Sequence, residues 1–109
     1  MATQAIPEPD EQTAARRAWV GLHAFRRDLL VTIAAFETPP KGVAIKDVLS
    51  SEYGEEVRHG RLYPNLDALA DADLLDKGTY DDRTNKYELT EWGERVLEAG
   101  ADRLAEVTA

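Results

Sequence analysis

Cysteine is absent from this 109-residue sequence, and long apolar runs are absent with it. Without cysteine the chain forms no disulfide, no thiolate redox sensor and no cysteine-based metal site. No apolar run approaches the ~20 residues that a membrane-spanning helix needs, and no signal-peptide core stands near the N-terminus. We therefore expect a cytoplasmic protein that does not engage a membrane.

The sequence also lacks signatures of catalysis. Its two histidines, His23 and His59, are far apart and have no neighbours at metal-ligand spacing. No glycine-rich phosphate loop and no nucleophile elbow is present. The sequence predicts neither an enzyme nor a protein with a metal or another cofactor.

The most informative pattern lies between Arg58 and Trp92 (RHGRLYPNLDALADADLLDKGTYDDRTNKYELTEW). Its first part predicts a short helix, because four leucines near helical spacing mark one buried face: Leu62, Leu66, Leu69 and Leu75. Proline is tolerated in the first turn of a helix, so Pro64 predicts a helix start near residues 59–61. This helix has the length and position of a recognition helix.

The second part of the pattern predicts a β-hairpin. Residues 75–80 and 86–89 are short strand candidates, and the polar residues 81–85 between them favour a turn. Tyr87 and Leu89 are expected to face the core. A helix followed by such a hairpin is typical of a winged helix-turn-helix.

The segments before this pattern complete the helical part. Residues 1–12 are rich in proline and acids and predict a flexible arm. Apolar residues then recur at helical spacing until Pro39-Pro40 ends the pattern, which predicts one long helical region: Trp19, Leu22, Phe25, Leu29, Ile33 and Phe36.

Residues 42–44 predict a short strand. A positioning helix is expected over residues 45–53, with Ile45, Val48 and Leu49 inward and Gly54 as its stop.

The last helix is expected to begin after Thr90, which resembles a helix cap with acids in the following turn. We therefore predict a mostly α fold with a small β-wing. The winged helix-turn-helix spans residues 13–90, and residues 91–109 add a C-terminal dimerisation helix. No following segment covers the apolar face of that helix, so a second subunit is the expected partner. The predicted dimer interface consists of Trp19, Phe25, Trp92, Val96, Leu97 and Leu104.

Candidate DNA-contacting residues cluster at the start of the recognition helix and on the wing. Arg61 and Asn65 are expected to contact base edges, because the N-terminal end of such a helix enters the major groove. Arg58, Tyr63 and Lys46 are expected to hold phosphate, and wing cations to contact phosphate or the minor groove. The full set is Lys46, Arg58, His59, Arg61, Tyr63, Asn65, Lys77, Arg83 and Lys86. For any one of them, an ordinary solvated surface position is the alternative.

The charge balance opposes DNA binding at ordinary ionic strength. The chain has 21 acidic and 13 basic residues and a formal net charge of −8. One explanation is a high-salt cytoplasm, since the Debye length falls to about 3 Å in 1 M salt. The low lysine count, 4 against 9 arginines, supports a halophilic host. The alternative is a winged-helix module that binds proteins and never contacts DNA.

The motif G-R-L-Y-P-x-L-x-x-L at residues 60–69, the wing, and Y-x-L-T-x-x-G at residues 87–93 resemble the PadR-like winged-helix transcription regulators, especially short haloarchaeal ones. The resemblance covers about residues 20–105. It implies a homodimeric, sequence-specific regulator of transcription whose terminal helix dimerises, and dimer symmetry then predicts a pseudo-palindromic operator in double-stranded DNA. Asp73 departs from the family pattern, which usually has glycine at the end of the recognition helix.

Overall fold

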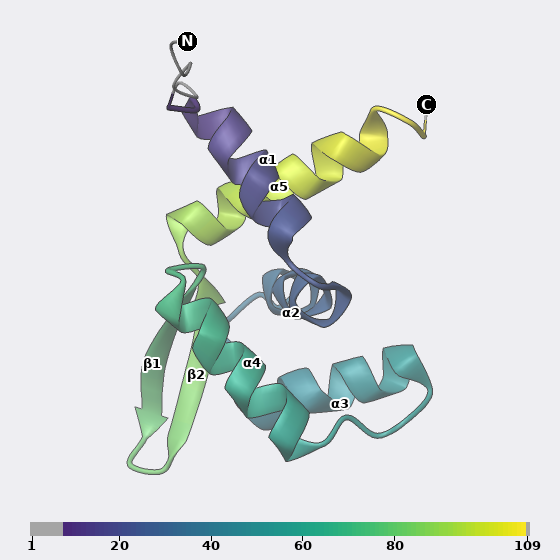
Figure 1. The fold of residues 1–109 in the computed structure, drawn as a ribbon. Helices are drawn as coiled ribbons and strands as arrows, with labels where there is room; N and C mark the ends of the chain where they lie inside the picture. The colour runs from purple at the N-terminus through teal and green to yellow at the C-terminus, as the bar shows by residue number, and fades with distance from the viewer. Residues whose placement is uncertain (1–7, 109) are drawn as a thin grey trace, which may run out of the picture.

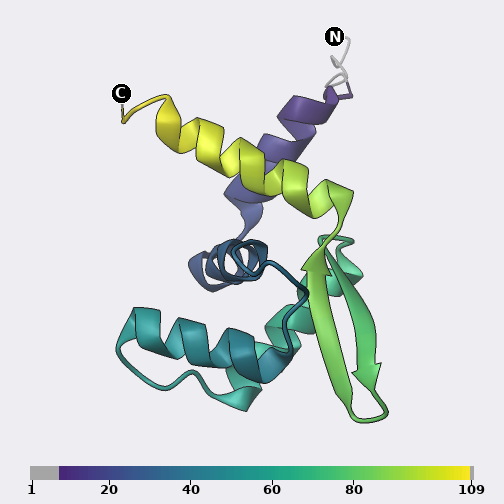
Figure 2. The same cartoon turned by 180° about the vertical axis from the view of Figure 1, so that it is seen from behind.

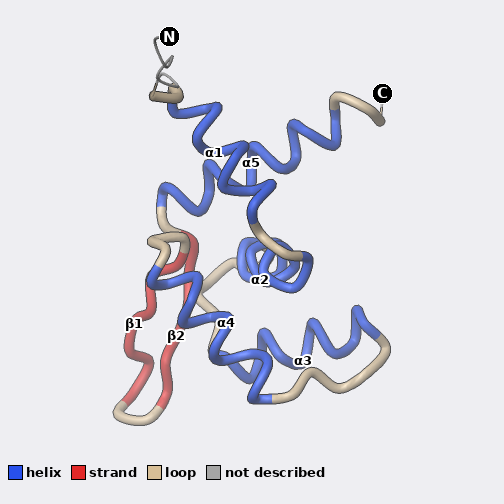
Figure 3. The backbone as a smooth tube through the Cα atoms, viewed as in Figure 1, coloured by secondary structure: helices blue, strands red, loops and turns tan. Residues whose placement is uncertain are grey.

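The computed structural model describes residues 8–108, which form five helices and one two-stranded sheet (Figures 1 and 3). In chain order the elements are α1 (Glu11–Gly21), α2 (Ala24–Ala34), α3 (Gly42–Tyr53), α4 (His59–Asp71), β1 (Leu75–Asp81), β2 (Thr84–Leu89) and α5 (Glu91–Ala105). Helices α2, α3 and α4 with the β1–β2 hairpin make the winged helix-turn-helix. The predicted mostly helical fold with a small wing is confirmed.

Helix α1 begins inside the segment predicted as an arm. Asp10 caps it, because its Oδ1 accepts a 2.7 Å hydrogen bond from the backbone N–H of Thr13. Glu11 and Gln12 are therefore helical. Residues 1–7 of the predicted arm lie outside the described residues.

The single helical region predicted up to Phe36 is two helices. Leu22 and His23 have extended backbone (ψ 133° and 163°), which ends α1 and starts α2. The Arg27 guanidinium donates hydrogen bonds to the carbonyl oxygens of Trp19 and Val20, at 3.1 and 3.0 Å, and so satisfies the end of α1. The break frees α1 to cross α5 (Figure 2).

Helices α1 and α5 cross closely because a glycine stands at the contact. A Cβ added to Gly100 would lie 2.3 Å from Cε2 of Trp19, so only glycine fits beneath that ring. Trp19 is 8% exposed, and Val96 on α5 is fully buried. Part of the apolar face of α5 is thus covered by α1 of the same chain, which corrects the expectation that a second subunit alone covers it.

Helix α3 begins earlier than predicted. Residues 42–44, predicted as a strand, form its first turn, and the pairing with the sheet falls just before them: Tyr87 N–H donates to Pro40 O at 3.0 Å. Gly54 ends α3 with a left-handed φ of 68°, as predicted. Ile45 and Leu49 are buried, but Val48 is 39% exposed, because it lies at the edge of the stripe that contacts α2 and α4.

Helix α4 starts at His59, within the predicted range. Pro64 lies in its second turn, which corrects its predicted place in the first turn. The hydrogen bond that proline omits would have used the carbonyl of Gly60, which is an exposed residue. Leu75 is not part of the helix but is the first residue of β1, where it is buried.

Asp73 ends the recognition helix in the conformation usually reserved for glycine. Its φ is 61°, the left-handed region, which asparagine and aspartate tolerate better than other side chains. The Thr90 hydroxyl donates to the Asp73 carbonyl oxygen at 2.5 Å and accepts from Gly93 N–H at 2.9 Å. The Thr90 cap on α5 therefore also fixes the exit of α4.

The wing is a short antiparallel hairpin. Leu75 pairs with Leu89 at its base and Asp81 with Thr84 at its tip. The strands run further than predicted, so the turn contains only residues 82 and 83. Tyr87 is 1% exposed, as predicted, and anchors the hairpin to the core.

Candidate nucleic-acid interface

The N-terminal end of α4 and the tip of the wing lie at the same end of the molecule, far from the start of α1 and the end of α5 (Figures 1 and 2). The α3–α4 connection reaches the same end. This places a helix N-terminus with free backbone N–H groups beside a protruding hairpin, the geometry with which winged helices meet a duplex.

Two arginines at this end have no acidic partner. Within residues 8–108, neither Arg58 nor Arg61 forms an ion pair, although acids outnumber bases in the chain. The Arg61 guanidinium lies 4.1 Å from the ring centroid of Phe25 and 5.8 Å from that of Tyr53. Stacking on rings leaves the N–H edges of a guanidinium available, so Arg61 is held in place with its hydrogen-bond donors free.

Tyr53 is itself fixed beneath Arg61. Its hydroxyl donates a 2.5 Å hydrogen bond to Oδ2 of Asp28 on α2. Burial, aided by this hydrogen bond, raises the pKa of Tyr53 to about 12. The aromatic support of Arg61 is therefore neutral at physiological pH.

His59 and Tyr63 form a second aromatic pair on α4. Their rings are stacked, with centroids 5.3 Å apart. The Tyr63 ring covers the first residue of α3, since a Cβ on Gly42 would lie 2.7 Å from the Tyr63 hydroxyl oxygen. Gly42 thus allows the positioning and recognition helices to approach closely.

Asn65 is engaged within the chain at both ends of its amide. Its Oδ1 accepts a 2.9 Å hydrogen bond from Nε of Arg26 on α2, and its Nδ2 donates to the Arg61 carbonyl oxygen at 2.6 Å. Reading adenine uses the same two groups. In this conformation one acceptor site and one N–H of the Asn65 amide are used within the chain, and the base contact expected of it stays a prediction.

Two of the predicted cations are paired with acids. Lys46 is mostly buried, with its Nζ 3.5 Å from Glu56. Lys77 on β1 lies 3.1 Å from Asp67 on α4, and this carboxylate raises the pKa of the Lys77 ammonium. Both lysines would have to exchange a carboxylate for phosphate in order to bind DNA.

The wing carries the remaining predicted cations. Arg83 is exposed in the turn. Its backbone N–H donates a 2.9 Å hydrogen bond to Asp81 Oδ1, and this bond lowers the pKa of Asp81. The stem of Lys86 packs over Gly78, whose added Cβ would lie 3.2 Å from Cε of Lys86. Within the described residues, neither cation forms an ion pair.

Sequence reasoning missed two residues that join this region. Lys41, just before α3, places its ammonium 4.0 Å from the ring centroid of Tyr80 on the wing. Arg26 reaches Asn65 from α2, outside the helix-turn-helix pair. Arg26 lies off the apolar stripe of its helix, a position from which the sequence left open contact with phosphate, pairing with a partner subunit or simple solvation. No local pattern indicated Asn65 as its partner.

The predicted dimer residues fall into two groups. Trp19, Phe25 and Val96 are buried within the single chain, so in this conformation they are core residues. Trp92 and Leu97 are half-buried, and Leu104 is 60% exposed.

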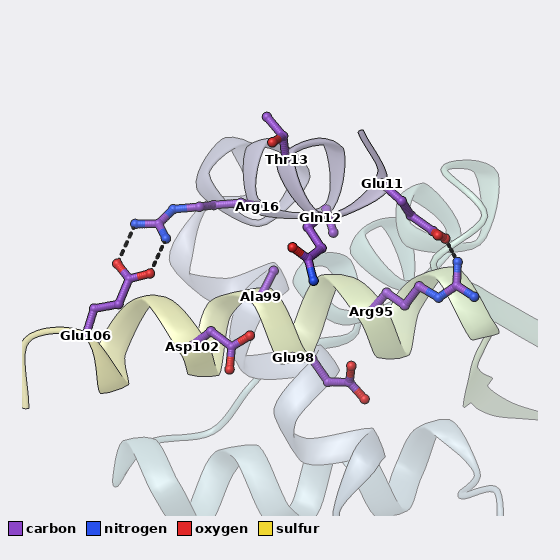
Figure 4. A pocket seen from close by; sticks show the side chains of 10 residues that line it. Glu11, Gln12, Thr13, Arg16, Arg95, Glu98, Ala99, Asp102 and Glu106 are labelled. Carbon is purple, nitrogen blue, oxygen red and sulfur yellow. Dashed lines mark hydrogen bonds and ion pairs between the residues drawn. The ribbon is translucent and has the colours of Figure 1, made fainter. Parts of the chain in front are cut away.

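Helices α1 and α5 border a groove of about 560 Å³, which Leu104 does not line. Arg16 closes one end of the groove with hydrogen bonds of 2.6 and 2.9 Å to Glu106, and Arg95 pairs with Glu11 at the other (Figure 4).

The α3–α4 pair and the β1–β2 wing define a winged helix-turn-helix protein. Its unpaired arginines stand where α4 begins. Residues 29–99 match the transcriptional regulator PadR-like family. The chain belongs to this family. Because the family consists of transcriptional regulators, the prediction that the chain is not an enzyme is confirmed.

Solved structures give the same assignment. RosR of H. salinarum, in a structure described as the complex hsRosR-S4, is 41% identical with a TM-score of 0.80, covering 87% of this chain and 82% of that one. RosR from crystals grown from NaBr is 41% identical with a TM-score of 0.74, covering 82% and 80%. A PadR-like transcription factor from Bacteroides fragilis shares the fold at 23% identity, with a TM-score of 0.62 over 86% and 92%. No match was found among curated proteins.

Among residues 8–108, no helix is both long and apolar enough to cross a membrane.

Proposed function

We propose that this chain is a sequence-specific DNA-binding regulator that acts as a homodimer in a high-salt cytoplasm. The observation that carries the proposal is the pair of arginines, Arg58 and Arg61, without acidic partners beside the wing of a strongly acidic protein. Arg58 and Arg61 stand where α4 begins, and cations at that helix end favour an anionic partner. Membership of a family of transcriptional regulators favours DNA as that partner.

Arg61 is the residue proposed to contact a base edge. It is the third residue of α4, so it stands at the helix end that enters the major groove, and its guanidinium is supported by the Phe25 ring. Arg58 and Tyr63 are proposed to hold phosphates on either side. Arg83 and Lys86 would then contact the flanking backbone from the wing.

The acidic charge is compatible with this role in molar salt. The Debye length there is about 3 Å, so acids elsewhere on the protein hardly oppose the approach of DNA. The 38–41% identity to a haloarchaeal regulator supports such an environment.

The homodimer is proposed to form through the outer parts of α1 and α5. Leu104 and Val107 are 60% and 80% exposed, and exposed apolar side chains at the end of a helix favour coverage by a second copy. A two-fold dimer presents two recognition helices, and its operator is then pseudo-palindromic with half-sites about one helical turn apart or a multiple of it.

The test is an electrophoretic mobility shift in molar potassium chloride with Arg61→Ala. We expect a loss of about 1–3 kcal/mol in operator binding and relaxed preference at one operator position. Arg17→Ala is the matched control, because it removes an exposed arginine from α1, near the opposite end (Figure 1). If selection from a random pool recovers no duplex that the parent protein binds, a protein-binding module replaces DNA binding as the proposed function.

A further inference from the structure

The hydrogen bonds of Asn65 indicate a role other than base contact. An asparagine recognises adenine by accepting from the base N6 amine through Oδ1 and donating to N7 through Nδ2. Here Oδ1 accepts from Arg26 Nε at 2.9 Å, and Nδ2 donates to the Arg61 carbonyl oxygen at 2.6 Å. One of the two acceptor sites of Oδ1 and one of the two N–H groups of Nδ2 are therefore used within the protein, which fixes the orientation of the amide. The bond from Arg26 has a charged donor, which makes it one of the stronger kind.

The same contacts hold Arg26 by one nitrogen and leave the rest of its guanidinium unused. A guanidinium has five N–H donors, of which Asn65 takes the one on Nε. Among residues 8–108, the two terminal nitrogens of Arg26 have no hydrogen-bond or ion-pair partner. Arg26 is half-buried, so its orientation is restricted by packing as well as by Asn65.

Arg26 and Arg61 are linked through Asn65, and neither residue forms an ion pair within residues 8–108. Asn65 bonds to both residues, and the Arg61 guanidinium lies over Phe25, which precedes Arg26 in the chain. No carboxylate among the described residues pairs with either group. A phosphate has the charge and the acceptor geometry that the pair lacks.

We propose that Arg26, on α2 and outside the helix-turn-helix pair, is a further phosphate-contacting residue, and that Asn65 is a positioning residue that holds Arg26 rather than a reader of base sequence. The inference rests on the proposed function. It also explains why an arginine on α2 is bonded to the middle of the recognition helix. Phosphate contacts set the position of a protein on DNA and carry no direct sequence information, so the two residues govern affinity and register.

The test compares Arg26→Gln, Asn65→Ala and the double variant, with Arg17→Gln as the control for loss of one exposed charge. The probes are an operator duplex, selected by the parent protein from a random pool, and a random duplex of equal length. Arg26→Gln should weaken binding to both duplexes by the same factor, about tenfold for one lost charge-assisted contact. It should also change the slope of log affinity against log salt by about one unit relative to the parent.

Asn65→Ala separates the two roles of Asn65. As a positioning residue, it should weaken binding to both duplexes equally, keep the base preference at every operator position, and add nothing in the Arg26→Gln background. A loss confined to the operator, with relaxed preference at one position, would make Asn65 a base reader and overturn the inference.

Thermal melting confirms that each variant is folded before its affinity is compared. If the parent binds DNA and Arg26→Gln binds both duplexes as tightly as the parent, this inference fails while the proposed function stands. If the parent binds no DNA, the proposed function itself fails. Free phosphate is tested by adding potassium phosphate at constant ionic strength. If phosphate competes with DNA for the parent protein but not for Arg26→Gln, the phosphate site is supported. If phosphate does not weaken DNA binding by the parent and Arg26→Gln binds DNA as the parent does, the site is excluded.

Discussion

Gly100→Ala places a methyl group at the crossing of α1 and α5. The added Cβ would lie 2.3 Å from Cε2, 2.4 Å from Cδ2 and 2.7 Å from Cζ2 of Trp19. Ordinary contact begins near 3.4 Å, so the indole or one helix must move by about 1 Å. Trp19 is 8% exposed, and the Arg27 guanidinium lies 5.2 Å from the centroid of its ring. The indole therefore has little room to move.

Two opposing terms set the size of the effect. Overpacking of this kind costs about 1–3 kcal/mol. Alanine in place of glycine within a helix contributes about 0.5–1 kcal/mol in the other direction. The overpacking term is larger, so we expect Gly100→Ala to lower the free energy of unfolding by about 1–2 kcal/mol. For a domain of this size that corresponds to a fall in Tm of roughly 4–8 °C.

Calorimetry in molar potassium chloride measures this change against a matched control. Gly60→Ala makes the same substitution in α4, where an added Cβ meets nothing within 4 Å, so its Tm should stay level or rise. In a Trp19→Leu background the obstacle is smaller, and Gly100→Ala should become neutral or stabilising. If Gly100→Ala alone raises the Tm as Gly60→Ala does, then α1 does not lie against α5 through Trp19.

Three further outcomes are expected. Leu104→Asp should convert the proposed dimer to a folded monomer by light scattering in molar salt, whereas Val31→Asp, which changes a valine on α2 that is also about half exposed, should leave the mass unchanged. An unaltered mass for both would move the interface elsewhere. Operator affinity should vary little in the parent between about 0.5 and 3 M potassium chloride, because acids near the DNA import cations that offset counterion release. The double variant Asp81→Asn, Asp82→Asn should lose affinity more steeply as the salt rises. A steep slope in the parent that the double variant leaves unchanged would contradict this. Tyr53 should ionise near pH 12 in the folded state and near 10 when unfolded, so its contribution to stability is complete below pH 10 and is lost as the pH rises to 12. In ultraviolet titration the difference between the parent and Tyr53→Phe should be a step near pH 12, and a difference near pH 10 would refute burial and the Asp28 hydrogen bond as the cause of the shift.

Features that depend on near neighbours in the chain were predictable from sequence. Leucines three and four residues apart marked the buried face of α4, Gly54 marked the end of α3, and Thr90 marked the start of α5. Each is governed by backbone geometry within a single turn, so its signal is local. The G-R-L-Y-P motif added the family, which the comparisons confirm.

Tertiary structure alone decided where the apolar faces and cations find their partners. The apolar spacing runs through Leu22 without a gap, so periodicity could not reveal the break that turns α1 onto α5. The contact of Trp19 with Gly100 joins residues far apart in sequence, and so does that of Arg26 with Asn65. Spacing within a helix determines which side chains share a face, but only the packing of helices against each other determines what that face meets.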